Sequence, residues 1–157
     1  VALYDQNNFC LMLPSQPNQS IGEAEGSSKA WCLPGAAATP GSTTLPSSAI
    51  KSAHVVLTDQ YIQVTGVLDS QQLQLLAGDD GGMYDNAPGG SEPRSGVSNA
   101  NNHPDYRNTV SYVELVGPAS GEYCLRICRL WTEGLEDACS NAQDTAGCHV
   151  VVPGDYS

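Results

Sequence analysis

Basic residues are scarce in this chain of 157 residues. Only 6 lysines and arginines stand against 17 aspartates and glutamates, which gives a formal net charge of −11 at pH 7. A protein that binds nucleic acid or an anionic membrane presents a basic surface to the phosphate groups. The composition therefore argues against nucleic acid as a partner, and it is typical of a soluble, secreted protein.

Long apolar runs are missing as well. A membrane-spanning helix needs about 20 consecutive apolar residues, and no stretch of this sequence has them, so we expect no membrane insertion. No signal peptide is present either, and a secreted form would carry Val1 after a processing site. A chain of this length with 40% hydrophobic residues can bury a core. We expect one domain over residues 1–157.

Turn-forming residues are abundant, with 16 glycines and 10 prolines. Between the turns, apolar residues recur at every second position, which indicates strands rather than helices. The predicted strands are 9–13, 52–58, 61–67, 72–77, 109–116, 122–128 and 149–152. Apolar residues occupy both faces of 109–116, which predicts a central strand. The segments 33–48 and 86–108 lack this pattern and are predicted to be irregular.

Two short helices complete the expected fold. Ser20 and Glu23 form a capping-box pattern, which predicts a helix from Ser20 to about Ala30. A second short helix is expected over 131–139. The fold class is therefore mainly β: an antiparallel, disulfide-stapled sandwich or barrel-like domain with one or two short helices.

The cysteine count is even, and the residues are Cys10, Cys32, Cys124, Cys128, Cys139 and Cys148. Their spacing fits no common zinc knuckle, so we interpret them as disulfides formed in an oxidising compartment. On a strand, Cys124 and Cys128 would lie about 13 Å apart, beyond the roughly 7 Å that a disulfide spans. We expect a local Cys128–Cys139 bridge, and at least one bond from Cys10 or Cys32 to the C-terminal cysteines.

A glycine-rich acidic loop, 78–85, is the predicted ligand site. Hard oxygen ligands from Asp79, Asp80 and Asp85 could bind Ca²⁺, although their spacing does not match an EF-hand, and a solvated acidic turn is the alternative. Tyr84 offers a ring on which a sugar can stack. The binding surface is completed by the polar face of the neighbouring strands, which carries Gln63, Thr65 and Gln74.

Catalytic motifs are hard to find. No G-x-S-x-G elbow accompanies the serines, the three histidines are scattered, and paired cysteines would not act as nucleophiles. A carboxylate pair such as Asp80 with Glu114 would suit a glycoside hydrolase, but nothing in the sequence places the two face to face. Asn18 begins the sequon Asn18-Gln19-Ser20, and we expect it to carry a glycan on the surface.

Several segments in order resemble a family of small secreted cysteine-rich fungal proteins, from basidiomycetes and early-diverging moulds, with no established activity. The segments are Gly22-Glu23-Ala24-Glu25, Ala30-Trp31-Cys32, Ile50-Lys51-Ser52-Ala53-His54, Tyr61-Ile62-Gln63-Val64-Thr65-Gly66, Asp79-Asp80-Gly81-Gly82, Tyr84-Asp85, Tyr123-Cys124-Leu125-Arg126-Ile127-Cys128, Gly147-Cys148 and Pro153-Gly154-Asp155-Tyr156. The resemblance implies an extracellular fungal protein and supplies no catalytic residues.

These observations favour a non-enzymatic function in the extracellular space. The chain would be a cell-wall or matrix component, or a glycan-binding protein, whose partners are glycans or cell-wall polysaccharide. A homo-oligomer that self-assembles through an unpaired sheet edge fits the same role. The alternatives are a secreted hydrolase acting on polysaccharide and a protease inhibitor or effector, for which 86–108 is the long candidate loop.

Overall fold

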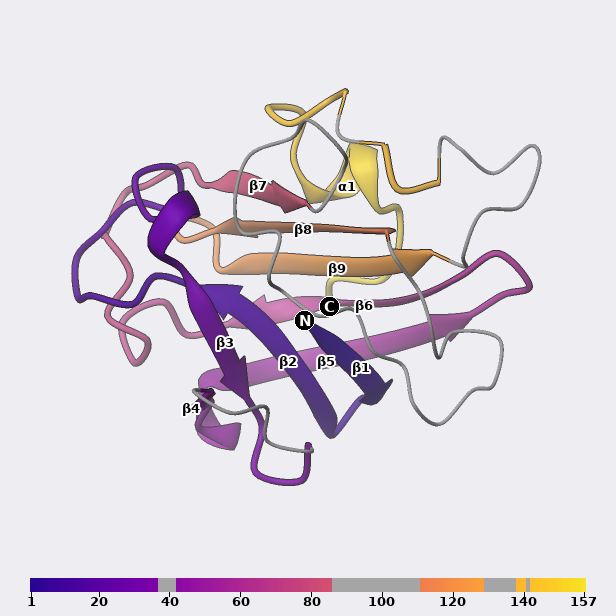
Figure 1. The fold of residues 1–157 in the computed structure, drawn as a ribbon, viewed down its shortest axis with the longest axis horizontal. Coiled ribbons are helices and arrows are strands. Elements are labelled where there is room, and N and C mark those ends of the chain that lie inside the picture. Colours follow the sequence, from indigo (N-terminus) through magenta and orange to yellow (C-terminus); the bar gives the residue numbers. More distant parts are fainter. Residues whose placement is uncertain (37–41, 86–110, 129–137, 141) are drawn as a thin grey trace.

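Two β-sheets pack face to face in the computed structural model, which describes residues 1–36, 42–85, 111–128, 138–140 and 142–157 (Figure 1). The strands are β1 (Ala2–Asp5), β2 (Asn8–Leu13), β3 (Lys29–Cys32), β4 (Thr43–Thr44), β5 (Ile50–Leu57), β6 (Tyr61–Leu68), β7 (Gly82–Asp85), β8 (Ser111–Gly117) and β9 (Glu122–Cys128). The short helices are η1 (Glu25–Ser27), η2 (Ser47–Ala49) and α1 (Cys148–Val151). The predicted antiparallel, sandwich-like fold is confirmed.

The chain fills one sheet before it begins the next. Sheet A has the strand order β1-β2-β3-β4, in which only the β3–β4 pair is parallel. Sheet B has the order β5-β6-β9-β8-β7 and is antiparallel throughout. Sheet B is therefore built from two hairpins, β5–β6 and β8–β9, that join along β6 and β9, and β7 is added beside β8.

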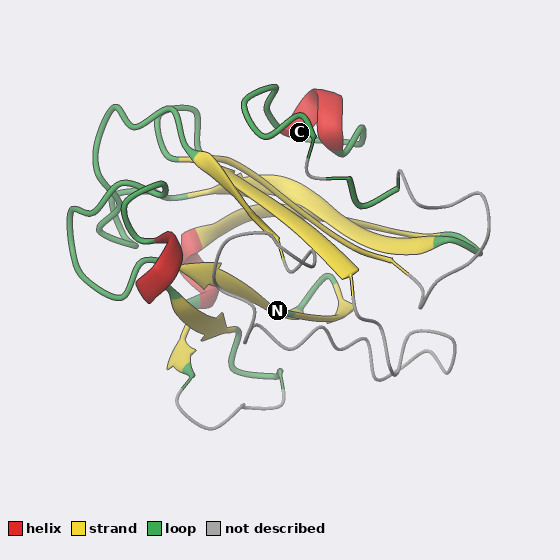
Figure 2. Ribbon diagram, turned by 45° about the horizontal axis from the view of Figure 1, so that its top comes forward, coloured by secondary structure: helices red, strands yellow, loops and turns green. Residues whose placement is uncertain are grey.

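Both faces of sheet B are covered by other parts of the chain. Tyr112, Val116 and Leu125 face sheet A and belong to the main core, whereas Val113 and Leu115 belong to a second cluster on the outer face. Figure 2 shows α1 on the side of sheet B that faces away from sheet A. The prediction of a central strand at 109–116 is thus confirmed, because β8 is buried on both faces.

Two predicted strands are wrong. Residues 72–77 form turns, in which Leu73 N–H donates to the Asp69 carbonyl and Leu75 N–H to the Ser70 carbonyl. Leu73 and Leu75 are still buried, so their spacing reflects a packed turn. The apolar run 149–152 lies mostly in helix α1, since a run of four apolar residues is too short to distinguish the two structures.

The helix expected from Ser20 is shorter than predicted. The Ser20 hydroxyl accepts a bond from Glu23 N–H at 3.1 Å, as the capping pattern requires. Between Ser20 and Cys32, helical structure is limited to η1, and Lys29–Cys32 is already strand β3. The segment 86–108 and most of 131–139 lie outside the described residues. No helix in the described part of the chain is long and apolar enough to cross a membrane.

All six cysteines are paired, as Cys10–Cys32, Cys124–Cys148 and Cys128–Cys139. The Cys128–Cys139 bridge and the separation of Cys124 from Cys128 agree with the prediction. The expected bond between the N-terminal and C-terminal cysteines is wrong, because Cys10 and Cys32 face each other across β2 and β3, with their Cα atoms 4.1 Å apart. No disulfide joins sheet A to sheet B.

Peptide mapping without reduction tests this connectivity. We expect three linked peptide pairs that correspond to the three bonds above, with no free thiol. Replacing Cys124 and Cys148 together with alanine should lower the free energy of unfolding by about 3 kcal/mol, because the bond closes a loop of 24 residues. A peptide joining Cys10 or Cys32 to any C-terminal cysteine would contradict the structure.

Candidate functional site

The polar strip predicted on sheet B is covered by the chain itself. Gln63 and Thr65 are each only 1% exposed. The Gln63 side-chain amide donates to the Pro153 carbonyl at 3.0 Å, and the Thr65 hydroxyl donates to the Asp155 carbonyl at 2.6 Å. The expectation that this face is solvated was wrong. The polar side chains that alternate along the strand donate to backbone carbonyls of the C-terminal segment and not to water.

A buried arginine completes this polar layer. Two guanidinium nitrogens of Arg126 donate to the Gln63 side-chain oxygen, and a third donates to the Ala138 carbonyl. The guanidinium carbon lies 4.0 Å from the ring centroid of Tyr61, within range of a cation–π interaction. Burial lowers the pKa of Arg126, but an arginine in a protein keeps its charge. Gln63 therefore links β9 to the C-terminal segment.

The acidic loop is partly structural. The Asp79 carboxylate accepts bonds from Ile21 N–H at 2.8 Å and from Gly81 N–H at 3.0 Å. Tyr84 is 1% exposed, and its hydroxyl donates to the Ile21 carbonyl. Asp85 is 6% exposed on β7. Asp79 and Tyr84 therefore attach the loop and β7 to the segment around Ile21.

The residues chosen from the sequence thus do not converge on one surface. Asp80 is exposed, while Gln74 lies in the turn before the loop with φ of 55°. Among the described residues, no three His, Cys, Asp or Glu side chains are grouped so that they could hold a metal ion. The prediction of a calcium site at Asp79, Asp80 and Asp85 therefore gains no geometric support.

Adjacent aspartates in this loop should behave differently when replaced. Asp79→Ala leaves two backbone N–H groups without their acceptor, so we expect a loss of about 1–3 kcal/mol in the free energy of unfolding. Asp80→Ala should change it by less than about 0.5 kcal/mol, because the side chain is exposed. Urea unfolding of both variants measures this. Equal effects would mean that the Asp79 bonds contribute little.

A hollow of about 520 Å³ opens where the acidic loop meets the β8–β9 turn. Its lining includes the acidic residues Glu25, Asp80, Glu122 and Asp144. The lining also includes the apolar residues Met83 on β7, Leu115 on β8 and Cys148 on α1. The site thus combines acidic residues from four separate segments with apolar residues. Only Asp80 among the predicted site residues belongs to it.

One glycine fixes the wall of this hollow. Gly81 has φ of 102°, which L side chains rarely adopt, and a Cβ there would lie 2.0 Å from the Val116 carbonyl oxygen. The loop can therefore approach β8 closely only with glycine at this position. The glycine-rich pattern of 78–82 was therefore informative. It permits the close packing of the loop that places Asp80 at the edge of the hollow.

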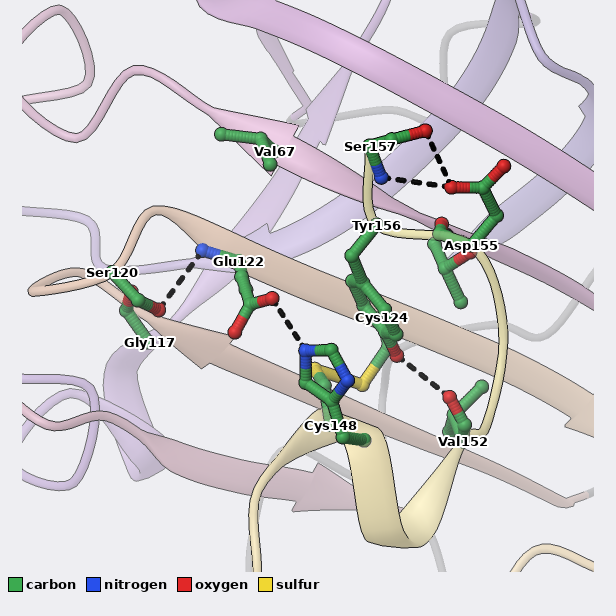
Figure 3. A network of polar contacts seen from close by, with 12 residues as sticks. Val67, Gly117, Ser120, Glu122, Cys124, Cys148, Val152, Asp155, Tyr156 and Ser157 are labelled. Atoms are coloured by element: carbon green, nitrogen blue, oxygen red, sulfur yellow. Dashed lines mark hydrogen bonds and ion pairs between the residues drawn. A yellow bond between two sulfur atoms is a disulfide. The ribbon is translucent and has the colours of Figure 1, made fainter.

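The opposite wall is anchored by a disulfide and an ion pair. Cys148 at the start of α1 is bonded to Cys124 on β9, and His149 pairs with the Glu122 carboxylate (Figure 3). The Ser120 hydroxyl also accepts a bond from Glu122 N–H at 3.2 Å. Sequence reasoning missed Glu122 and His149, which are 27 positions apart and share no local motif. The sequence signal that could have pointed to this pair was Cys148, because its disulfide partner had to lie close to the residue that follows it, His149.

A different acidic group lies inside the sandwich. Glu114 on β8 is 1% exposed, and one carboxylate oxygen accepts a bond from Met12 N–H at 2.7 Å. The other oxygen is buried without a hydrogen-bond partner among the described residues. Burial raises the pKa of Glu114 to about 8, against the lowering effect of the Met12 bond. Glu114 is therefore sealed from the hollow and cannot face Asp80 as a hydrolase pair.

This carboxyl group makes stability depend on pH. A group whose pKa rises from 4.5 to about 8 on folding binds its proton more tightly in the folded state. Its contribution is complete below about pH 4.5 and is lost as the pH rises through 8. We expect the free energy of unfolding to fall by a few kcal/mol across this range, and Glu114→Gln to flatten the profile. If the free energy of unfolding of Glu114→Gln still falls by the full amount, other titratable groups cause the decline.

Comparison with known proteins gives two fungal relatives. The chain is 31% identical over 161 residues to the appressorium protein ROW1 and 28% identical over 162 residues to the appressorium protein ROW2, both from the basidiomycete Mycosarcoma maydis. Each alignment covers 95% of this chain, but only 35% of ROW1 and 51% of ROW2. The chain thus spans a third to a half of these relatives. No protein-family model and no solved structure matches it.

Proposed function

We propose that this chain is a non-enzymatic, secreted domain of a fungal surface that binds cell-wall polysaccharide in the hollow beside the β8–β9 turn. The observation that carries the proposal is the lining of the hollow, which combines acidic residues from four segments with apolar residues. Sugars present hydroxyl donors around apolar C–H faces, so they complement such a surface. The volume lies within the roughly 300–1,000 Å³ of ligand sites in general.

Rigidity of the walls supports a binding role. The loop wall is held by Asp79 and by the close approach of Gly81 to β8. The α1 wall is held by the Cys124–Cys148 bond. A site whose walls are fixed before binding loses less conformational entropy when the ligand arrives. The geometry therefore favours recognition of a defined sugar unit.

Extracellular placement rests on the covalent structure and the relatives. Paired cysteines persist in oxidising compartments and are rare in the cytosol, and all six cysteines here are paired. Both relatives are fungal proteins that carry the name of the appressorium. Asn18 is exposed in a turn, so the fold would accommodate a glycan there. Glycosylation of Asn18 stays a prediction.

The alternative functions gain less support. A hydrolase needs a carboxyl group of raised pKa that reaches the substrate, and the described carboxyl group that has a raised pKa is Glu114, between the sheets. An inhibitor needs an exposed rigid loop, and the candidate 86–108 lies outside the described residues. Neither alternative has a specific observation in its favour.

A glycan array followed by titration calorimetry tests the proposal. We expect binding to one class of wall polysaccharide, and the double variant Asp80→Asn with Asp144→Asn should weaken it at least tenfold while the fold persists, because both side chains are exposed. That loss corresponds to about 1.4 kcal/mol. Asp59→Asn is the matched control, since it removes an exposed charge at the opposite end of sheet B.

Addition and removal of calcium during the titration separates direct binding from binding through a metal. If wild type and the double variant of Asp80 and Asp144 bind the polysaccharide with equal affinity, the hollow is excluded as the site. Release of reducing sugar during the experiment would instead support the hydrolase alternative. An array with no hits for folded protein would contradict glycan binding altogether.

A further inference from the structure

The hollow beside the β8–β9 turn holds negative charge that the protein does not neutralise. Among the described residues that line it, there are four acidic side chains and no lysine, arginine or histidine. Glu122 is paired with His149 on the adjoining wall (Figure 3). The carboxylates of Glu25, Asp80 and Asp144 form no hydrogen bond or ion pair with any described residue. These three charges are therefore left for a ligand to balance.

The unpaired carboxylates are spread around the hollow rather than gathered at one point. Glu25 belongs to η1, Asp80 to the loop before β7, and Asp144 to the turn before α1. In the described part of the chain, no three acidic, histidine or cysteine side chains are grouped so that they could hold a metal ion. A single cation would thus leave most of this charge unmatched. A chain-like ligand with several positive groups can meet each carboxylate separately.

The charge of a ligand decides how well it enters such a site. A concave surface lined by one sign of charge strengthens the local field and attracts the opposite charge. A neutral sugar would remove water from the unpaired carboxylates without supplying a counter-charge, which costs free energy. A sugar acid would be repelled. A protonated amine supplies the counter-charge, and its N–H donors form charge-assisted hydrogen bonds that are roughly twice as strong as neutral ones.

We propose that the ligand of the hollow is a polysaccharide of amino sugars whose amino groups are free and protonated. The inference rests on the proposed function, to which it adds the chemical class of the sugar. The amines meet Glu25, Asp80 and Asp144, while Met83 and Leu115 provide apolar surface for the C–H faces of the rings. An acetyl group on the same nitrogen would remove the positive charge and weaken the fit.

A basic peptide also carries ammonium groups, but a sugar suits a site with fixed walls better. Gly81 and the Cys124–Cys148 bond fix two walls of the hollow. The ammonium of a lysine lies at the end of a flexible four-carbon stem, whose rotamer freedom is lost when the group is held in place. The amine of an amino sugar is attached directly to a rigid ring, so less conformational entropy is lost on binding.

Titration calorimetry with two oligosaccharides of equal length, one of glucosamine and one of N-acetylglucosamine, tests the inference. The buffer is mildly acidic, so that the free amines are protonated. We expect the glucosamine oligomer to bind at least tenfold more tightly, a difference of about 1.4 kcal/mol. The preference should shrink as salt is added, because salt screens charges near the surface.

Two neighbouring glutamates give a matched pair of variants. Glu25→Gln should weaken binding of the glucosamine oligomer at least threefold and leave binding of the acetylated oligomer unchanged, because it removes one charge from the lining. Glu23→Gln removes the same charge from an exposed side chain that does not line the hollow, and it should have little effect on either oligomer. Asp80→Asn, on a different segment, should behave like Glu25→Gln.

The outcomes separate this inference from the proposed function. Equal affinity for the two oligosaccharides, or tighter binding of the acetylated one, would overturn the inference and leave glycan binding standing. A lysine oligomer of equal charge that binds as tightly would overturn the choice of a sugar as the cationic ligand. Loss of binding in the presence of a chelator would overturn direct recognition of the amines. Failure to bind any oligosaccharide would contradict the proposed function as well.

Discussion

Burial of β8 and β9 on both faces is the constraint on which the rest of the structure depends. Tyr123, Leu125 and Ile127 face sheet A, while Cys124, Arg126 and Cys128 face the C-terminal segment. A strand buried on both sides needs a cover on each, and the chain supplies sheet A for one face and α1 with residues 152–157 for the other. The hollow forms at the margin of the second cover, where the chain turns into α1.

The hydrophobic alternation predicted four of the five strands in the sheet that carries the site, but not β7, which lies in the segment 78–85 that we expected to be a loop. The strands β5, β6, β8 and β9 follow the period-two pattern within a few residues, because each has one apolar face against the common core. The pattern failed at 72–77 and 149–152, where buried leucines and valines belong to turns and a short helix. Local spacing specifies which side chains are buried, but it does not separate a strand from a tight turn packed against the same core.

The candidate site was harder to predict than the fold. Polar residues on a strand were interpreted as solvated, yet Gln63 and Thr65 bond to backbone carbonyls that lie 90 positions away in the sequence. The acidic loop was correctly identified as unusual, but Asp79 and Tyr84 stabilise structure. Which carboxylates gather around a hollow depends on the approach of segments distant in sequence, and no pattern within one segment encodes that.

The placement of the disulfides has a mechanical consequence. Two covalent loops, one within sheet A and one between β9 and the C-terminal region, resist extension, whereas the chain between Cys32 and Cys124 carries no crosslink. Tension applied at the two ends of the chain would be able to extend that segment, which holds β4 to β8, to its full length. The disulfide-closed loops on either side cannot be extended in this way, so they limit the greatest length that the chain can reach.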